Sequence, residues 1–567
     1  MAKTLAVAGH AAARARLTTA SSTVAATAIF GGALALRLVV AALMTFPPLG
    51  DAAYYIAVAQ SLYAGHGFTV GSVWNYQPPP RAAVGPSNDY WGPLTSIAEW
   101  VSLLVFGNHL YAALIPGAIA GASLASLTYL CGRRAFEEWL SNRSVDAAAV
   151  KRDAHWLALG AAMLIAVGSE LTYQSVMGDS GMLYGVIGFG ALLLWDRASR
   201  LPRGTLAPRW LDRTWGWSGA SGAAWGAGVL LGCAYLTRGS VIFLATALGL
   251  WWMWRMLKSP QEADAASRRA LVGAAAALAA GAAVVMAPWL IRQQMVFGHM
   301  FSPEATHNAL AFSIEDFSEY GAPPTLATML SHGIGALVGL RVDALWNDWH
   351  HVTDYLLYPS ALPAVVGLAL MARRQSTARL GLIAFSVLLL GFALAFPAVT
   401  LFGGYYHSVA SVAPFLAWGY LACIYVVAAW ARGRVPLRIS LAPPLAAIPL
   451  LLQIALLAFA VPAIGAGASH DRAMFASVST WLRAHHAAVV MTNQSSSLYY
   501  ASGIPAIELP AAQSPEVAYT CAQHYGATYL VLFGSAGGYP GALRDGQRAR
   551  FVLVDQTPEY EVYHIGP

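Results

Sequence analysis

The chain has 567 residues, of which 57% are hydrophobic and only 11% are charged, and its formal net charge is +6. Soluble domains carry roughly 25% charged residues, so this composition excludes a soluble globular protein, and the high hydrophobic content excludes a disordered one. The basic residues stand in short clusters between apolar runs, which favours a role in membrane orientation over nucleic-acid binding. We therefore interpret the sequence as a polytopic α-helical membrane protein.

Apolar runs predict the helices that cross the membrane, because about 20 residues are needed to cross a hydrocarbon core of about 30 Å. The sequence contains eleven such spans, near residues 22–46, 109–131, 154–170, 180–195, 219–237, 239–254, 270–291, 355–372, 380–399, 408–430 and 440–463. A further apolar stretch at 94–107 is shorter and would rise only about 21 Å as a helix. We expect it to lie at the membrane interface.

The charge distribution predicts the orientation. With the N-terminus inside, the cytoplasmic segments hold 23 of the 33 Lys and Arg residues, as the positive-inside rule requires. If 94–107 crossed the membrane, every later basic cluster would move outside, so eleven spans and an outer C-terminus are favoured. The first run is long, contains Arg37 and lacks a clear cleavage site, which argues against a cleaved signal peptide.

This topology leaves two loops, near 47–108 and 292–354, and a polar tail on the outer side. Within the tail, the pattern predicts a helix at 475–486, buried strands at 487–492 and 528–533, a helix at 514–526 and a terminal hairpin at 550–565. We therefore expect a transmembrane domain at 1–466 and a small extracytoplasmic α/β domain at 467–567. We also predict that this tail lies over the mouth of a cavity and helps to hold a substrate.

Ionisable residues gather at the outer ends of the predicted spans: Asp51, Glu170, Asp179, Arg238, Arg292 and His407. Charged groups at membrane depth are costly unless they pair or face a water-filled cavity, so this concentration indicates a site. Arginine binds phosphate bidentately and a carboxylate removes a proton from a nucleophile, which is the chemistry that a lipid phosphate and a polar acceptor require. For the individual residues, roles as helix caps or interfacial anchors stay open.

The segment PPLGDAAYYIAVAQSLYAGHGF at 47–68 places an acidic residue after the first span, followed by paired tyrosines. It resembles the first outer loop of the GT-C superfamily, especially the bacterial branch related to protein O-mannosyltransferases and lipid A aminoarabinose transferases. Further segments resemble that branch in the same order: WGPLTSI (91–97), GDSGMLYGVIGF (178–189), YLTRGSVIFLA (235–245) and APWLIRQQMVFGHMFSPEATHNAL (287–310). Each motif by itself has low specificity, but together the motifs cover roughly the first 430 residues.

The resemblance implies an inverting glycosyltransferase that uses a polyprenyl-phosphate sugar donor. Asp51 matches the catalytic acidic residue, which deprotonates the acceptor hydroxyl for displacement at the anomeric carbon. Asp179 matches an acidic position that places the acceptor or, in some members, supports a divalent ion. Asp51 and Asp179 are therefore also candidate ligands of Mg²⁺ or Mn²⁺. Arg238 and Arg292 take positions that face the donor phosphate.

The remaining candidates for acceptor or sugar binding are Tyr54, Tyr55, Glu170, His307, Tyr406 and His407. One departure concerns a pair before the tenth span: many relatives carry Arg-Tyr where this chain has Tyr405-Tyr406-His407. This weakens the transfer of donor contacts to that site and leaves the sugar open. Outer-loop aromatics such as Trp74 and Trp91 could stack on sugar faces or form an interfacial aromatic belt, and both alternatives stay open.

The implied location is the bacterial cytoplasmic membrane, with the C-terminal domain outside. The implied partners are a polyprenyl-phosphate-linked sugar and a glycan, lipid or protein acceptor of the cell envelope. The sequence shows no nucleotide-binding domain, which suits a lipid phosphate as the leaving group. The competing class is a transporter or flippase of a lipid-linked glycan. Such proteins usually have paired halves and charges near the bilayer midplane, and this sequence shows neither.

Overall fold

Helices dominate the fold. The computed structural model describes residues 2–76, 80–141, 146–200, 219–257, 265–321, 323–356, 360–432, 442–510, 515–534 and 550–566. Each of the eleven predicted spans falls on a helix: α1 (Ala2–Ala41), α4 (Leu110–Ser141), α5 (Ala147–Val167), α7 (Gly181–Arg200), α9 (Gly219–Tyr235), α10 (Val241–Leu257), α11 (Ala265–Phe297), α15 (Leu362–Ala372), α16 (Ser376–Ala395), α18 (Ala413–Arg432) and α19 (Ala442–Ala484).

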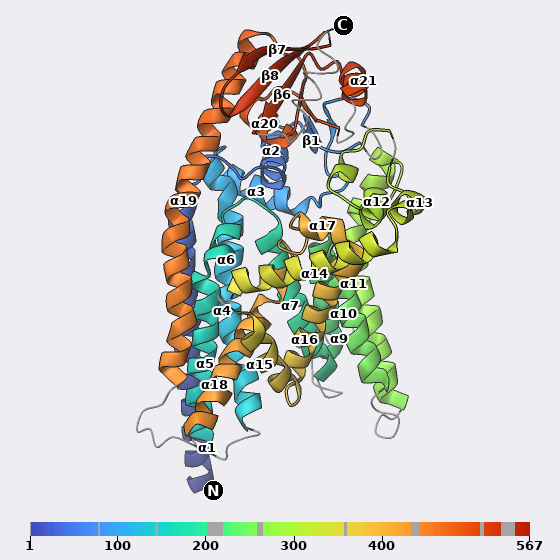
Figure 1. Cartoon of the computed structure of the whole chain (residues 1–567). Coiled ribbons are helices and arrows are strands. Elements are labelled where there is room, and N and C mark those ends of the chain that lie inside the picture. Colours follow the sequence, from blue (N-terminus) through green and yellow to red (C-terminus); the bar gives the residue numbers. More distant parts are fainter. Residues whose placement is uncertain are drawn as a thin grey trace.

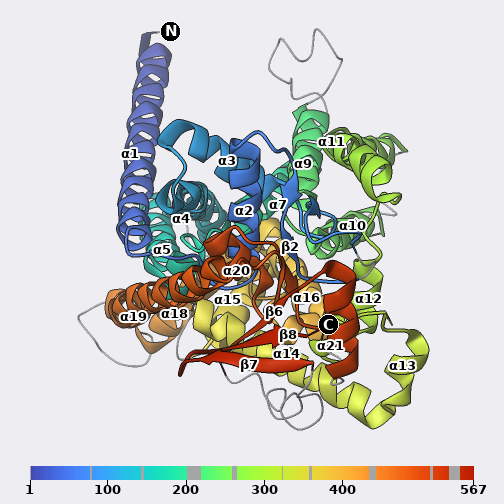
Figure 2. The ribbon, with the colours of Figure 1, turned by 90° about the horizontal axis from the view of Figure 1, so that it is seen from above.

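Within the described residues, six of these helices are long and apolar enough to cross a membrane by length and composition: α1, α4, α11, α16, α18 and α19. The chain is therefore a polytopic helical membrane protein, as predicted. The N-terminus and the C-terminal region lie at opposite ends of the helix bundle (Figure 1). Seen from above, α1 stands at the edge of the bundle and the C-terminal strands cover part of it (Figure 2).

Local chemistry sets several helix ends. The carboxylate of Asp146 accepts the backbone N–H groups of Ala148 (2.9 Å) and Ala149 (3.3 Å), and so caps α5. The span predicted at 355–372 begins later, as α15, because the preceding α14 (Ile334–Leu356) continues into that range. Pro363 in the first turn of α15 suits a helix start, since proline lacks the N–H that would be unpaired there.

The bundle packs through small residues. A Cβ atom at Gly228 of α9 would overlap the carbonyl oxygen of Leu278 on α11. In the same way, a Cβ at Gly367 of α15 would overlap the carbonyl oxygen of Gly419 on α18. Such close backbone approaches are typical of helix contacts in membranes, where dispersion contacts supply much of the attraction.

Arg37 is a fully buried cation within α1. Its guanidinium donates to the carbonyl oxygens of Ile165 (3.1 Å) and Ala166 (2.9 Å) at the end of α5, and to Ser175 Oγ (2.9 Å). The last four carbonyl groups of a helix have no partner inside that helix, and a cation there also interacts favourably with the helix dipole. Arg37 therefore ties α1 to α5 and to the segment that leads to Asp179.

The remaining helices lie in the connections between spans: α2 (Asp51–Tyr63), α3 (Leu94–Phe106), α6 (Ser169–Gln174), α12 (Glu304–Leu310), α13 (Leu326–Ser331), α14 and α17 (Pro397–Leu401), with 3₁₀ turns at Glu315–Phe317 and Val409–Ser411. The stretch predicted as an interfacial helix is α3. It buries Ser96 and Glu99 and exposes Leu104, Val105 and Phe106, so one of its faces is apolar and uncovered by protein.

The C-terminal region is built on a six-stranded sheet with the order β2-β5-β4-β6-β8-β7. Its strands are β2 (Ser72–Val73), β4 (Val490–Thr492), β5 (Ala506–Glu508), β6 (Tyr529–Phe533), β7 (Phe551–Gln556) and β8 (Tyr560–Ile565). The two strands predicted to be buried are β4 and β6, which lie at the centre of the sheet. The predicted hairpin is the antiparallel pair β7–β8. Both predictions are confirmed. A separate two-stranded ribbon pairs β1 (Thr69–Val70) with β3 (Gly85–Pro86).

Two features of this region were not predicted. The first outer loop contributes β2, which pairs in parallel with β5, so the sheet contains a strand from more than 400 residues upstream. The helix predicted at 475–486 is the end of α19, which runs without interruption from the last span into the sheet domain. The expected boundary at 466/467 lies inside this helix, because no proline follows Pro462 to end it.

Both faces of the sheet are covered. The end of α19 and α20 (Ser495–Ser502) pack on one face, where Phe475, Val478 and Leu482 are fully buried. On the other face, α21 (Pro515–Tyr525) packs through Cys521 and Tyr525. The central strands are therefore buried on both sides, which explains their continuous apolar sequence.

Phe475 joins the membrane part to the sheet. Its ring stacks on Phe46, at the end of the first span (5.0 Å between centroids), and lies 4.5 Å from the ring of Phe533 on β6. We expect Phe475→Ala to cost about 3–5 kcal/mol, the usual loss for a buried phenylalanine. The check is the apparent unfolding temperature in detergent, with Phe459→Ala as control because Phe459 of α19 is 81% exposed. Equal temperatures for the two variants would contradict this role.

Candidate active site

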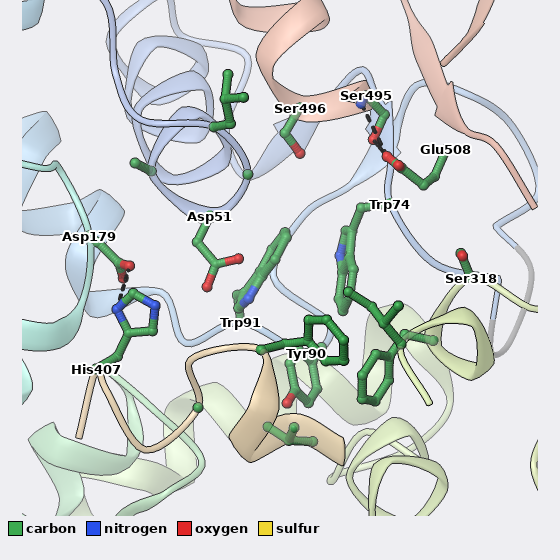
Figure 3. A pocket seen from close by; sticks show the side chains of 18 of the residues that line it. Asp51, Trp74, Tyr90, Trp91, Asp179, Ser318, His407, Ser495, Ser496 and Glu508 are labelled. Carbon is green, nitrogen blue, oxygen red and sulfur yellow. Dashed lines mark hydrogen bonds and ion pairs between the residues drawn. The ribbon is translucent and has the colours of Figure 1, made fainter. Parts of the chain in front are cut away.

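A cavity of about 500 Å³ lies between the ends of the membrane helices and the C-terminal domain (Figure 3). We call its charged end the charged pole: Asp51, Asp179, Arg238 and His407. The C-terminal domain supplies the other end, the domain pole: Asn493, Gln494, Ser495, Ser496 and Glu508. Aromatic side chains line the wall between them: Trp74, Tyr90, Trp91, Phe317 and Phe402. Volume and lining are typical of a small-molecule site.

Both carboxylates of the charged pole follow a glycine in the left-handed region. Gly50 (φ +86°) precedes Asp51, the first residue of α2, and Gly178 (φ +77°) precedes Asp179 in the loop before α7. Only glycine adopts such φ values without strain. The N–H of Gly50 also donates to Ser497 Oγ on α20 (3.3 Å), so the C-terminal domain contacts the turn that bears Asp51.

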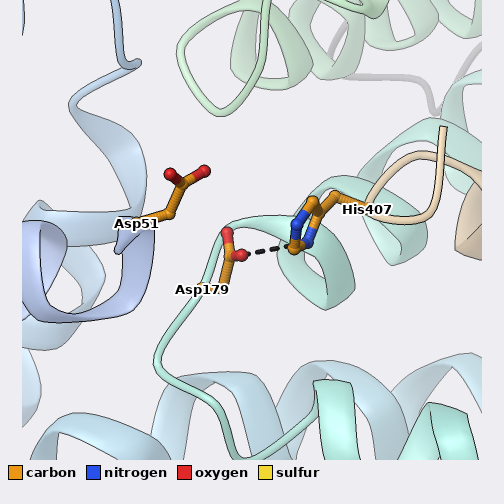
Figure 4. A group of neighbouring side chains, drawn as sticks. All are labelled: Asp51, Asp179 and His407. Carbon is orange, nitrogen blue, oxygen red and sulfur yellow. Dashed lines mark ion pairs between the residues drawn. The ribbon is translucent and has the colours of Figure 1, made fainter. Parts of the chain in front are cut away.

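Asp179 is the centre of an ion-pair network. His407 Nδ1 lies 2.9 Å from Asp179 Oδ2, and Arg238 Nη1 lies 3.6 Å from Oδ1. Ser180 Oγ donates to the same Oδ1 (2.7 Å) and accepts from Arg238 Nη1 (2.6 Å). The side chain of Asp51 makes no hydrogen bond or ion pair with any other residue that the structure describes. Figure 4 shows Asp51, Asp179 and His407 close together from three separate segments.

The two carboxyl groups differ in acidity. Burial raises the pKa of Asp51, and the negative charge of Asp179 raises it further. Burial also opposes ionisation of Asp179, but His407, Arg238 and the hydrogen bonds from Ser180 outweigh it and lower the pKa of that carboxyl. Neighbouring acids whose pKa values are pushed apart typically divide the tasks of proton exchange and fixed charge. Asp51 suits the first task and Asp179 the second.

The charged pole also fits a divalent cation. The ligand atoms of Asp51, Asp179 and His407 all lie within 4.8 Å of one another. The structure thus adds His407 to the two ligands that the sequence predicted. Two carboxylates and an imidazole can together coordinate a divalent cation.

We expect millimolar Mn²⁺ to raise the unfolding temperature of the purified protein. A ligand at 100 times its dissociation constant stabilises the folded state by about 2.7 kcal/mol. Asp179→Asn should abolish the shift, whereas Asp89→Asn should preserve it, because Asp89 pairs with His299 (2.7 Å) and does not line the cavity. An unchanged unfolding temperature of the wild type with Mn²⁺ would indicate that the Asp179 network is a closed set of ion pairs.

Arg238 keeps donors available for a ligand. Only its Nη1 is engaged, and its Nε and Nη2 make no hydrogen bond to the described residues. The side chain is 15% exposed and lines the cavity. A guanidinium carries five N–H donors in a plane that matches the oxygens of a phosphate. Arg238 can therefore bind an anion without losing its contacts to Ser180 and Asp179.

Solved structures with the same architecture include ArnT from Cupriavidus metallidurans bound to undecaprenyl phosphate (TM-score 0.55, 14% identity, covering 95% of this chain and 99% of that one). The apo form of that ArnT is similar too (TM-score 0.54, 14% identity, 97% and 100%). A third is the archaeal oligosaccharyltransferase AglB from Archaeoglobus fulgidus, in complex with an inhibitory peptide and a dolichol-phosphate (TM-score 0.51, 12% identity, 88% and 69%).

The chain has the GT-C fold. The likeness to ArnT extends over nearly the whole of both chains and therefore includes the C-terminal region. The fold implied by the sequence motifs is thus confirmed. No protein-family model and no curated protein matches the sequence.

Arg292 lies outside the cavity of this GT-C fold. Its Nη2 donates to the carbonyl oxygen of Ser87 (3.1 Å), and its guanidinium lies over the ring of Phe68 (5.2 Å), which is also in the first outer loop. It does not belong to the described residues that line the cavity. These contacts hold the first outer loop against α11, and the predicted role in donor binding stays a prediction.

Other predicted residues lie outside the cavity lining: Tyr54, Tyr55, Glu170, His307 and Tyr406. Tyr54 supports the aromatic wall, since its hydroxyl accepts the N–H of Asn88 (2.7 Å) and its ring lies 4.1 Å from that of Trp91. The ring of Tyr406 lies 5.0 Å from that of His407. Both tyrosines therefore lie directly behind residues of the cavity, and their binding roles stay predictions.

The structure also shows wall residues that the sequence analysis left open or missed. Trp74 and Trp91 line the cavity with stacked rings (4.3 Å, 23°), which favours the sugar-stacking alternative for these two. Glu304 of α12 lines it as well, is 4% exposed, and its Oε1 has no hydrogen-bond partner among the described residues. Burial raises the pKa of Glu304. Glu304 falls in the family-like segment 287–310, but its place in the cavity wall depends on tertiary packing.

Proposed function

We propose that the protein is an integral-membrane inverting glycosyltransferase that moves a sugar from a polyprenyl phosphate to an acceptor hydroxyl. The observation that supports this most directly is the charged pole. Asp51, a carboxylate that pairs with none of the described residues, faces a cavity beside Arg238, whose Nε and Nη2 make no hydrogen bond to those residues. The same fold is found in ArnT and AglB, whose structures hold undecaprenyl phosphate and a dolichol-phosphate. A base, a phosphate-binding cation and a fixed alignment are what this reaction requires.

In the proposed reaction, Asp51 accepts the proton of the acceptor hydroxyl while the hydroxyl oxygen attacks the anomeric carbon. The bond between that carbon and the phosphate oxygen breaks on the opposite side, so the anomeric configuration inverts. The polyprenyl phosphate leaves with the bonding electrons, and Arg238 stabilises its charge. Asp179 holds Arg238 and His407 in place. A divalent cation held by Asp51, Asp179 and His407 would add positive charge beside the leaving phosphate.

We further propose that the cavity opens on the outer face of the bacterial cytoplasmic membrane. The positive-inside distribution places the N-terminus in the cytoplasm. Residues of the C-terminal domain line the cavity. That domain stands at the end of the bundle away from the N-terminus (Figure 1). The charged residues gather at this end, which favours a transferase over a flippase, whose functional charges usually lie near the bilayer midplane.

The proposal is tested with the purified protein in lipid nanodiscs. Radiolabelled polyprenyl-phosphate mannose, arabinose or amino-pentose is supplied together with a cell-envelope fraction. We expect label from one donor to enter the acceptor fraction with an inverted linkage, and slow release of free sugar when acceptor is omitted. Asp51→Asn should do neither.

The alternative function, a flippase, predicts a different experimental result. Reconstitution into sealed proteoliposomes allows movement of the intact labelled donor between leaflets to be measured. Movement of the donor without transfer or hydrolysis would overturn the proposal in favour of a flippase of lipid-linked glycans.

A further inference from the structure

Two strands that are distant in sequence meet where the aromatic wall reaches the domain pole. On β2 and β5, which pair in parallel, Ser72 stands opposite Ala506. Val73 stands opposite Ile507 in the same pair, and the next residue on each side is Trp74, directly after the end of β2, and Glu508, the last residue of β5. Side chains two positions apart leave a strand on the same face, so both project to one side of the sheet. Both line the cavity.

Glu508 presents an unused oxygen at this pole. Its Oε2 accepts the backbone N–H (3.1 Å) and the hydroxyl (2.6 Å) of Ser495. No described residue makes a hydrogen bond to its Oε1. Figure 3 shows this carboxylate with Ser495 at the edge of the cavity. Desolvation raises the pKa of Glu508 to about 7, so near neutral pH the group both donates and accepts hydrogen bonds.

The aromatic wall runs from the charged pole to Glu508. Figure 3 shows the indole of Trp91 beside Asp51 and that of Trp74 beneath Glu508. Their ring centroids are 4.3 Å apart, and Tyr90 adds a third ring 5.5 Å from Trp74. Flat aromatic faces supply apolar contact area with little loss of side-chain entropy.

We propose that Trp74, Ser496 and Glu508 form a subsite for a sugar residue of the acceptor. This rests on the proposed function and names its acceptor class: a carbohydrate, either the glycan of a lipid or a polysaccharide. A pyranose has a C–H face that packs on an aromatic ring and a rim of hydroxyls that bind carboxyl and hydroxyl groups. The cavity offers both kinds of surface here, because Trp74, Ser496 and Glu508 all line it, and Ser496 Oγ has one hydroxyl partner, Ser72 Oγ (3.3 Å).

The occupant of this subsite is the acceptor, because the donor is restricted to the other pole. The lipid chain of the donor must lie among the membrane helices, and its phosphate requires a cation. Arg238 is at the charged pole, whereas no lysine or arginine lines the domain pole within the described residues. An acceptor sugar held there would direct a hydroxyl along the wall toward Asp51.

Point variants test this better than deletion of the tail. Deletion after residue 466 would cut α19, remove the strand that pairs with β2, and remove Ser497, which holds the turn before Asp51. Such a deletion would disturb both poles at once.

The first measurement is saturation-transfer NMR on the full-length protein in nanodiscs. The probes are oligosaccharides released from cell-envelope glycolipids and polysaccharides by mild acid. We expect binding by the wild type, at least tenfold weaker binding by Trp74→Ala, and several-fold weaker binding by Glu508→Gln. Trp74→Phe should recover most of the affinity. Glu559→Gln should bind normally, because it is a control in the same domain whose side chain is 41% exposed.

The second measurement is kinetic, and it separates the two proposals. Trp74→Ala and Glu508→Gln should raise the acceptor KM at least tenfold, while donor hydrolysis without acceptor stays within twofold of wild type. Failure of the wild type to turn over any donor, with oligosaccharide binding intact, would overturn the transferase proposal and leave a saccharide subsite. Transfer by the wild type without oligosaccharide binding would overturn the subsite alone. So would binding of serine-rich peptides in place of oligosaccharides, or an equal loss of donor hydrolysis in both variants.

Discussion

Replacing Asp51 with Asn should lower the kcat of sugar transfer by about 10²- to 10⁴-fold, the usual loss when a general base is removed. The substitution preserves size, and the Asp51 side chain makes no hydrogen bond to a described residue that Asn would break. The apparent unfolding temperature should therefore stay close to that of the wild type. Initial rates at saturating donor and acceptor, together with unfolding temperatures, provide the check.

A matched control comes from α14. Asp343 is an exposed carboxylate outside the cavity, so Asp343→Asn should keep transfer within twofold of the wild-type rate. Wild-type turnover by Asp51→Asn would exclude Asp51 as the base. Glu304 would then be the next carboxylate to test, because it lines the same cavity and its Oε1 has no hydrogen-bond partner among the described residues.

Replacing Arg238 with Ala should raise the apparent KM for the polyprenyl-phosphate donor by about 10- to 150-fold. This corresponds to a loss of ~1.5–3 kcal/mol for a charge-assisted hydrogen bond to phosphate. The acceptor KM should change much less, because the proposed acceptor subsite lies at the other end of the cavity. Steady-state kinetics with each substrate varied in turn separate the two effects.

Two further arginine variants serve as controls for the phosphate-binding role of Arg238. Arg238→Lys keeps the positive charge but loses the planar fork, so it should fall between wild type and Arg238→Ala. Arg292→Ala should lower the unfolding temperature by loosening the first outer loop, with little change in the donor KM. A donor KM raised as much by Arg292→Ala as by Arg238→Ala would instead support the predicted phosphate role of Arg292. Equal effects of Arg238→Ala on donor and acceptor would argue against its phosphate contact.

The sequence by itself determined the membrane architecture. Apolar runs and the positions of basic residues depend on local composition, and the bilayer imposes a fixed length on each crossing. All eleven predicted spans accordingly fall on helices, and α3 is the predicted short apolar helix. The strands β4 and β6 and the hairpin β7–β8 were also predictable, since strand burial and turns leave local patterns.

The motifs that resemble the GT-C superfamily predicted three residues of the charged pole: Asp51, Asp179 and Arg238. Each follows or precedes a span end, so its approximate depth is a property of the local sequence. His407 was singled out for its position at a span end, but its pairing with Asp179 (2.9 Å) could not be predicted. Residues 179 and 407 meet only because α7 and the segment after α17 pack together.

Only the tertiary structure decided how the cavity is closed. The pairing of β2 with β5 brings Trp74 to Glu508, and α20 brings Ser497 to the turn before Asp51. A two-residue strand such as β2 has no periodicity of its own, so its partner is set by the sheet edge it meets. Glu304 lies in a family-like segment and Glu508 does not, but burial among distant neighbours raises the pKa of both, which the local sequence does not show. Long-range packing therefore set the domain pole, whereas local composition had already set the membrane core.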